Sequence, residues 1–312
     1  MKTLRVILNL LLFAAALLAA VTITVLLGWS WRAMRFMMYM LLPIWIGSQY
    51  KWEFSGILAL FAGAVAAFYV FITPEAQFGN IKKWEDCCAR KPTVQKLDGN
   101  KFRIENVRDF RYRTPDDFDI RYFTGVYDAD ALKSLDLAVS HWDGMDDIAH
   151  TMLCFNFSDG KSLALSVEMR CPKGTSRGYY TTFFKQHALI YIWATPEDIL
   201  NLRSNYRGEA MYLYRTAATP EEVRKLFLML MKRTDELSGR EEFYRTVFGN
   251  CTTEWLPYLK ATRPTLRWDI RALINGSFDR LLFEQGFLSH RDGEIFESLR
   301  ARSFVQKTSP QP

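Results

Sequence analysis

The stretch AHTMLCFNFSDGKSLALSVEMR, Ala149–Arg170, decides the fold because it has the pattern of two β-strands joined by a tight turn. Its central SDG suits a three-residue hairpin loop in which Gly160 takes a left-handed conformation and forms a bulge. Such a loop pairs Phe157 with Lys161 and fixes the register of both strands. A two-residue loop would shift the pairing by one residue and mix the two faces of the hairpin.

Side-chain alternation supports this register. One face of the hairpin is apolar along its whole length and contains Leu153, Phe155, Phe157, Leu163, Leu165, Val167 and Met169. The other face is small and polar and contains His150, Met152, Cys154, Asn156, Ser162, Ala164, Ser166 and Glu168. In this register His150 lies opposite Glu168, with about 5.5 Å between the β-carbons.

A carboxylate opposite a histidine can hold one ring nitrogen as a donor, which leaves the other nitrogen free to accept a proton. His150 is therefore a candidate general base and Glu168 a candidate orienting acid. From the residue pattern alone, a surface ion pair on a polar sheet face is the more ordinary explanation for this pair.

A candidate nucleophile stands about a hundred residues later, in the stretch FYRTVFGNCTTEWLPYL. If Asn250 caps a helix, Cys251 is its first residue, where unpaired N–H groups and the helix dipole favour a thiolate. The same amide groups, around Asn250 and Thr252, are candidates for an oxyanion site. Alternatively Cys251 is a small buried hydrophobic residue, and Pro257 is expected to kink the helix.

The remainder of this region predicts an α+β domain with an antiparallel sheet and packed helices. Further strands are expected at Lys101–Val107, Tyr122–Asp128, Leu135–Trp142, His187–Ala194 and Glu209–Thr216. Two helices open with a threonine N-cap and a proline, at Thr195 and Thr219, and Glu222 completes a capping box in the second.

The amino-terminal part has the composition of a membrane anchor. Val6–Leu27 is long enough to cross a bilayer, Phe36–Gly47 is short and contains a proline, and Gly56–Ile72 is nearly full length. Two or three spans are therefore possible, and the count decides on which side the remainder lies. We expect an anchor at residues 1–76, an α+β domain at 77–305 and a disordered tail at 306–312.

Composition narrows the possible partners. The net charge of +6 is modest and no RNA-binding motif or basic stripe is present, so nucleic acid is not expected. Five cysteines without a C-x-x-C pair predict no metal site, and no cofactor is expected. In an oxidising compartment Cys87, Cys88 or Cys171 could form disulfides, and the sequence does not assign their pairing or the oligomeric state.

Two arginine-rich stretches are candidate binding sites for a phosphate or lipid headgroup. VRDFRYR carries Arg108, Arg111 and Arg113, and NYRGE carries Arg207. Guanidinium groups bind phosphates well, although ion pairs on a solvated strand are the more ordinary explanation for such a pattern. Arg207 is alternatively a structural partner of Glu209.

Five motifs together resemble the Lnb N-terminal periplasmic domain family. They are VRDFRYR at Val107–Arg113, IAHTMLCFNF at Ile148–Phe157, SVEMR at Ser166–Arg170, NYRGEAMYLYR at Asn205–Arg215 and NCTT at Asn250–Thr253. They follow one another along almost the whole region after the anchor. The hydrophobic head also resembles that of relatives with three amino-terminal spans and an external domain.

The resemblance implies a permuted papain-like, NlpC-like thiol enzyme in which the histidine precedes the cysteine. It implies Cys251 as nucleophile, His150 as base and Glu168 as orienting acid. It further implies an integral protein of the bacterial inner membrane with its domain on the periplasmic face. The implied activity is cysteine-dependent acyl transfer or hydrolysis on a membrane lipid or lipoprotein, as in lipoprotein intramolecular transacylases. A cell-wall peptide amidase and a non-catalytic membrane scaffold remain as alternatives.

Overall fold

The computed structural model describes residues 74–81, 83–142, 145–175, 186–245 and 249–306. Contacts within the chain divide it into two units, Met1–Gln77 and Phe78–Pro312. The expected membrane spans, and all but the first residue of the expected tail, lie outside the described residues. Among the helices that are described, none combines the length and the apolar character that crossing a bilayer requires.

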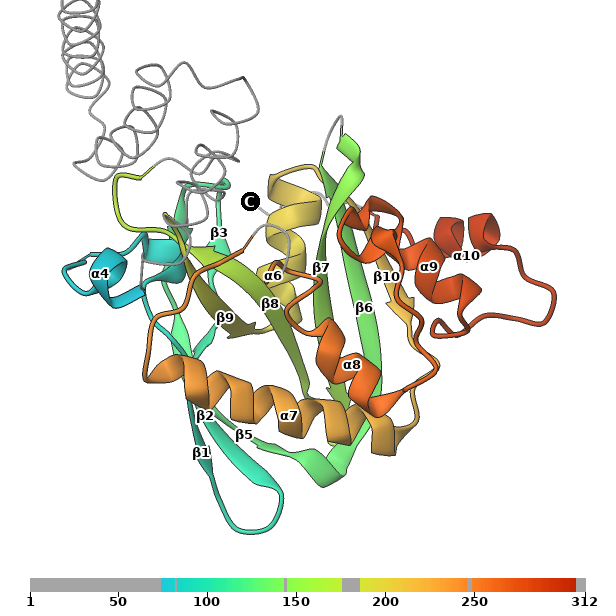
Figure 1. Cartoon of the computed structure of the whole chain (residues 1–312), viewed down its shortest axis with the longest axis horizontal. Helices are drawn as coiled ribbons and strands as arrows, with labels where there is room; N and C mark the ends of the chain where they lie inside the picture. The colour runs from blue at the N-terminus through green and yellow to red at the C-terminus, as the bar shows by residue number, and fades with distance from the viewer. Residues whose placement is uncertain (1–73, 82, 143–144, 176–185, 246–248, 307–312) are drawn as a thin grey trace, which may run out of the picture. The chain divides into compact units, whose positions relative to one another are not determined.

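The second unit is an α+β domain built on one large sheet (Figure 1). Its strands are β1 (Thr93–Lys96), β2 (Lys101–Arg108), β5 (Tyr122–Asp128), β6 (Leu132–Trp142), β7 (Met145–Phe157), β8 (Ser162–Arg170), β9 (Ala188–Ala194) and β10 (Ala210–Arg215). A separate ribbon pairs β3 (Arg111–Tyr112) with β4 (Phe118–Asp119). The described α-helices of this unit are α6 (Pro196–Asn201), α7 (Pro220–Ser238), α8 (Leu256–Thr262), α9 (Phe278–Glu284) and α10 (Phe296–Arg302). Helix α4 (Pro74–Phe78) spans the boundary between the two units.

The strand order is β1-β2-β9-β8-β7-β6-β10, with β5 paired to β2. Most neighbours are antiparallel, but β2 and β9 are parallel where Arg108 meets Ala194. The sheet is therefore mixed, and the expectation of an antiparallel sheet was wrong at this one junction. A parallel pair requires a long crossover connection, which no local sequence pattern reveals.

The central hairpin has the predicted register. Gly160 has φ +85°, the Phe157 N–H donates to the Lys161 carbonyl at 2.9 Å, and the β7–β8 ladder runs from Asn156–Ser162 to Met152–Ser166. Continuing this register two residues beyond the ladder brings His150 opposite Glu168. The turn chemistry thus determines which side chains meet at the far end of the hairpin.

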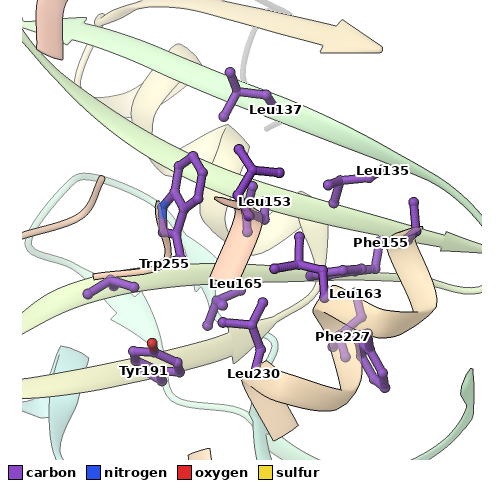
Figure 2. Close-up of a cluster of buried hydrophobic side chains, with 14 of the residues drawn as sticks. Leu135, Leu137, Leu153, Phe155, Leu163, Leu165, Tyr191, Phe227, Leu230 and Trp255 are labelled. Carbon is purple, nitrogen blue, oxygen red and sulfur yellow. The ribbon is translucent and has the colours of Figure 1, made fainter. Parts of the chain in front are cut away.

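The apolar face of the hairpin forms the main core. Figure 2 shows Leu153, Phe155, Leu163 and Leu165 packed against Phe227 and Leu230 of α7. Helix α7 begins with the predicted capping box, since Thr219 Oγ1 accepts from the Glu222 N–H and Glu222 Oε2 accepts from the Thr219 N–H. Capping and an amphipathic face together hold the helix across the sheet.

The opposite face of the hairpin is also covered, although it was predicted to be small and polar. Met152, Cys154 and Ala164 form a second buried cluster with Ile199 of α6. Met169, expected in the main core, packs against this second cluster instead. It lies past the end of the β7–β8 ladder, where β8 has lost β7 as a neighbour but still pairs with β9, with Met169 opposite Leu189.

Candidate active site

The candidate nucleophile lies where the β7–β8 ladder ends. Beyond the Met152–Ser166 pair, β7 no longer bonds to β8 and contacts the segment 250–252 instead. Thr151 Oγ1 donates to the Cys251 carbonyl at 3.0 Å, and Cys251 Sγ lies 3.8 Å from the Ala149 carbonyl oxygen. The open end of the hairpin therefore receives Cys251 from a distant part of the chain.

Helix α8 begins at Leu256, and Cys251 lies in the turn before it, not in the first helical position that the sequence predicted. Pro257 occupies the first turn of α8, where the missing N–H costs nothing, so no kink is needed. Asn250 nevertheless caps the backbone, because its Oδ1 accepts from the N–H groups of Thr252 and Thr253, each at 2.9 Å. The Thr252 amide is thereby already bonded and is not open to an oxyanion.

The candidate base lies beside the candidate acid on the neighbouring strand. Nε2 of His150 lies 2.7 Å from Ser166 Oγ and 3.2 Å from Glu168 Oε1. Ser166 Oγ itself donates to Glu168 Oε1 at 2.7 Å, so it accepts from His150. Because Nε2 is held as a donor on this side, Nδ1 is the nitrogen available to exchange a proton with a thiol.

The thiol and the imidazole are coupled electrostatically. Burial acts to raise the pKa of the Cys251 thiol, but the charge of His150, a hydrogen bond with its imidazole and the Thr151 N–H together lower it to about 7. Burial and the Arg203 charge act to lower the pKa of His150, but Glu168 and Cys251 raise it to about 9. Between these values the thiolate–imidazolium pair is the favoured state.

A buried guanidinium stands behind the acid. Arg203 donates to Glu168 Oε1 at 2.8 Å and to Glu209 Oε2 at 3.2 Å, and its side chain is only 5% exposed. It comes from the π-helical turn Leu202–Tyr206, which continues α6 and ends with the Arg207 N–H bonded to the Leu202 carbonyl. Single π turns are frequent at functional sites. Burial acts to raise the pKa of Glu168. The charges of His150 and Arg203 outweigh burial and lower this pKa well below its ordinary value.

Two further side chains reach the thiol. Asn275 Nδ2 lies 3.5 Å from Cys251 Sγ and donates to Thr252 Oγ1 at 2.7 Å, while Asn275 Oδ1 accepts from the Ala149 N–H at 2.9 Å. Burial raises the pKa of Tyr244 well above its ordinary range, and a backbone hydrogen bond from Cys251 is too weak to reverse this shift. The Tyr244 phenol is therefore protonated and can act as a donor beside Cys251.

These groups open onto one cavity of about 570 Å³. Cys251, His150 and Glu168 lie in its wall with Tyr244 and Asn275. Much of the remaining lining is apolar and consists of Met169, Ile192, Ile199, Leu202, Leu273 and Ile274. The volume is in the range of small-molecule pockets, and the apolar wall suits a hydrocarbon group.

The predicted headgroup arginines do not gather in one place. Arg108 lines the cavity, but its guanidinium is buried and makes two hydrogen bonds to Asp198, at 2.7 and 2.9 Å. Arg111 on β3 and Arg113 directly after it are exposed and pair with acidic neighbours, namely Asp109 for the first and Asp117 and Asp119 for the second. These three arginines form ion pairs with acidic side chains, which is the more ordinary of the two explanations that the sequence analysis gave for the arginine-rich pattern.

Arg207 lies at the cavity wall, with Nη1 3.7 Å from Glu209 Oε1 and a side chain 34% exposed. Of the four candidate arginines it is the one that combines exposure with a place in the cavity lining.

Sequence reasoning missed Ser166, Arg203, Tyr244 and Asn275 as members of this site. Ser166 shares the polar hairpin face with Glu168, so side-chain alternation could have included it. Arg203 and Asn275 reach the site through a π turn and a short 3₁₀ helix, Asn275–Ser277, for which the sequence carries no short-range signal. All five cysteines of the chain lie in described regions, and none of them forms a disulfide bond in this structure.

A family model described as the Lnb N-terminal periplasmic domain matches residues 119–276, just over half of the chain. The chain therefore belongs to this family. The matched region contains His150, Glu168 and Cys251, and it excludes Arg108, Arg111 and Arg113. Searches of curated proteins and of solved structures returned no significant match.

Proposed function

We propose that this member of the Lnb N-terminal periplasmic domain family is a cysteine-dependent acyltransferase or hydrolase that acts on a membrane lipid or lipoprotein through a thioester at Cys251. One observation gives the proposal its main support. The Cys251 thiol, with its lowered pKa, is hydrogen-bonded to the His150 imidazole, and both open onto a largely apolar cavity. The apolar wall favours an acyl chain over a cell-wall peptide, whose groups need many polar partners.

In the first step the Cys251 thiolate attacks the carbonyl carbon of an ester. A carbon–sulfur bond forms, the bond to the ester oxygen breaks, and the His150 imidazolium gives its proton to the leaving alkoxide. In the second step an amine or a water molecule attacks the thioester. His150 takes the proton of this nucleophile, and the thiolate is released.

Glu168 orients His150 and stabilises the imidazolium, as acids do in other nucleophile–base pairs. We assign the oxyanion to the Tyr244 hydroxyl, which accepts from the Cys251 backbone and keeps its own proton to donate, because the Thr252 amide is already bonded to Asn250. Donors fixed before the reaction stabilise developing charge at little reorganisation cost. The order of histidine before cysteine agrees with a permuted papain-like arrangement, which we propose for the domain.

The family and the apolar amino-terminal stretches support an inner-membrane anchor with this domain on the periplasmic face. An enzyme at a bilayer surface meets acyl substrates without extracting them into water.

The test uses the purified full chain incubated with phospholipid and with a diacylated lipopeptide. We expect intact-mass analysis to find an acyl adduct on Cys251 that neutral hydroxylamine removes, as it does with thioesters. Cys251→Ser should lose this adduct, and Cys171→Ser, which changes another thiol in the same cavity wall, should keep it. An unmodified Cys251 together with cleavage of a cell-wall peptide would establish the amidase alternative instead.

A further inference from the structure

The segment Arg267–Ile274 exposes an unusual amount of apolar surface. Trp268 is 70% exposed, Ile270 51% and Ile274 54%, within seven residues of one another. Scattered single exposed hydrophobic residues are ordinary, whereas a contiguous group marks a contact surface.

Buried residues and hydrogen bonds hold this segment in place, so that these side chains face outward. The side chains of Leu266 and Ala272 are buried in the domain and anchor the segment to it. The Arg267 N–H donates to Gln285 Oε1 at 2.8 Å, and Gln285 Nε2 returns a bond of 3.3 Å to the Arg267 carbonyl. The exposure is therefore a property of an anchored loop.

Ile270 and Ile274 lie on one face of a single helical turn. The Ile274 N–H donates to the Ile270 carbonyl at 3.1 Å, and residues four apart in such a turn lie side by side. Ile274 also lines the cavity that contains Cys251. The apolar surface is thus continuous from outside the molecule to the lining of the cavity.

Charge favours an anionic partner for this surface. The one acidic residue of the segment, Asp269, is bonded by the Arg271 guanidinium at 2.9 and 3.0 Å, and the same guanidinium pairs with Glu284 at 2.8 Å. Within the segment itself two arginines stand against one aspartate. Arg267 is exposed beside Trp268, and the whole chain has a net charge of +6. Tryptophan and aliphatic side chains beside a basic residue are typical of segments that bind at a membrane interface.

We propose that the segment Arg267–Ile274 docks on an anionic lipid bilayer, with Trp268, Ile270 and Ile274 inserted at the level of the headgroups. Docking there brings the mouth of the Cys251 cavity to the lipid surface. The contact does not require Cys251 to be catalytic, so it can fail or hold independently of the proposed function.

The test uses the full chain reconstituted in vesicles of phosphatidylglycerol and phosphatidylethanolamine, with or without bromine on the acyl chains. Bromine quenches tryptophan fluorescence only at short range. The difference between the wild type and Trp268→Phe isolates the emission of Trp268 from that of the other tryptophans. We expect brominated lipid to reduce this difference emission severalfold.

Two aspartate variants provide a matched comparison. Ile270→Asp changes the proposed face, and Ile120→Asp changes a side chain of nearly equal exposure, 52%, elsewhere on the domain. We expect the first to restore the Trp268 emission and the second to leave it quenched. Equal behaviour of the two variants would overturn the assignment of this face.

Unquenched Trp268 emission in brominated vesicles would overturn the proposal whatever else covers the surface. Acrylamide, a water-soluble quencher, then identifies the reason. Free access would indicate a solvated loop, and protection would indicate a protein surface, either a partner or the amino-terminal unit of this chain.

Discussion

Arg203 Nη2 lies 2.8 Å from Glu168 Oε1, the same carboxylate oxygen that lies 3.2 Å from His150 Nε2. One oxygen of Glu168 therefore contacts both cationic groups. Since Arg203 also reaches Glu209, a single buried guanidinium compensates two carboxylates. Such a group is difficult to replace, because removing it leaves Glu168 with only His150, and Glu209 with only the more distant Arg207, as a cationic partner.

We expect Arg203→Met to lower the free energy of unfolding at neutral pH by about 3–5 kcal/mol. Arg203 lowers the pKa of Glu168, so the carboxylate pKa rises in the variant. A depressed carboxylate pKa contributes stability above the pKa of the unfolded chain, and this contribution is lost as the pH falls. The deficit of the variant should therefore be largest at neutral pH and shrink in acid.

Urea unfolding at neutral and mildly acidic pH measures this deficit. Adding Glu209→Gln to Arg203→Met should recover part of the loss, because one of the two carboxylates that lost the Arg203 charge is then neutral. Arg113→Met removes an exposed arginine with two acidic partners and should change stability much less, because solvent screens exposed ion pairs. Equal losses from the two single variants would show that the buried cluster has no special energetic role.

The second prediction concerns the pH dependence of Cys251 alkylation by iodoacetamide. The His150 charge lowers the Cys251 pKa to about 7, so the labelling rate should rise with pH through a midpoint near this value. In His150→Ala burial is the dominant influence, and the midpoint should move above the ordinary value of 9.0.

Mass spectrometry of the labelled peptides follows each cysteine separately. Cys154 is an internal control, since burial raises its pKa to about 12 and it should stay unlabelled near neutral pH. An unchanged Cys251 midpoint in His150→Ala would remove the imidazole as the cause of the shift.

Local features of the sequence predicted the parts of this site that depend on local chemistry. The SDG turn and strict alternation were sufficient for the β7–β8 register and for the His150–Glu168 pairing. The helix start was predicted five residues too early because Asn250 does cap backbone amides, whereas the position of Pro257 sets where α8 begins. Capping and helix initiation are separate events here, and the local pattern does not distinguish them.

Features that depend on distant packing could not be predicted. The parallel contact between β2 and β9 joins two strands that are far apart in the sequence, because β3 to β8 lie between them in the chain. Asn275 reaches Cys251 from a 3₁₀ helix of a single turn, which is too short to show periodicity, and Arg203 points inward because the helix widens into a π turn. Each of these features depends on the packing of the completed domain, which short-range sequence patterns do not predict.

The third prediction separates the two functions of Asn275. Asn275→Asp keeps an acceptor for the Ala149 N–H but replaces the donor 3.5 Å from Cys251 Sγ with a negative charge. A nearby like charge disfavours the thiolate, so the alkylation midpoint of Cys251 should rise above about 7 while the fold is retained.

Asn275→Ala is the comparison. It removes the acceptor and leaves the buried Ala149 N–H unpaired, which should cost about 1–3 kcal/mol of stability. The expected difference is therefore a pKa shift without unfolding for the aspartate variant and a loss of stability for the alanine variant. An unshifted alkylation midpoint in Asn275→Asp would contradict contact between Asn275 and the thiol.

The last prediction concerns Tyr244, which lies in the cavity wall and is bonded to the Cys251 backbone. Its raised pKa keeps the phenol protonated throughout the working range, so it can donate to a developing oxyanion. Tyr244→Phe removes only the hydroxyl. We expect the rate of acyl-adduct formation on Cys251 to fall by about 10²–10³, the usual loss for one oxyanion donor.

Iodoacetamide separates this effect from a change in the nucleophile, because alkylation by displacement forms no oxyanion. The alkylation rate of Tyr244→Phe should stay close to that of the wild type while acylation falls. A parallel fall in both rates would mean that Tyr244 acts by positioning the thiol. Tyr212→Phe, in which a tyrosine of β10 outside the cavity lining loses its hydroxyl, should leave both rates unchanged.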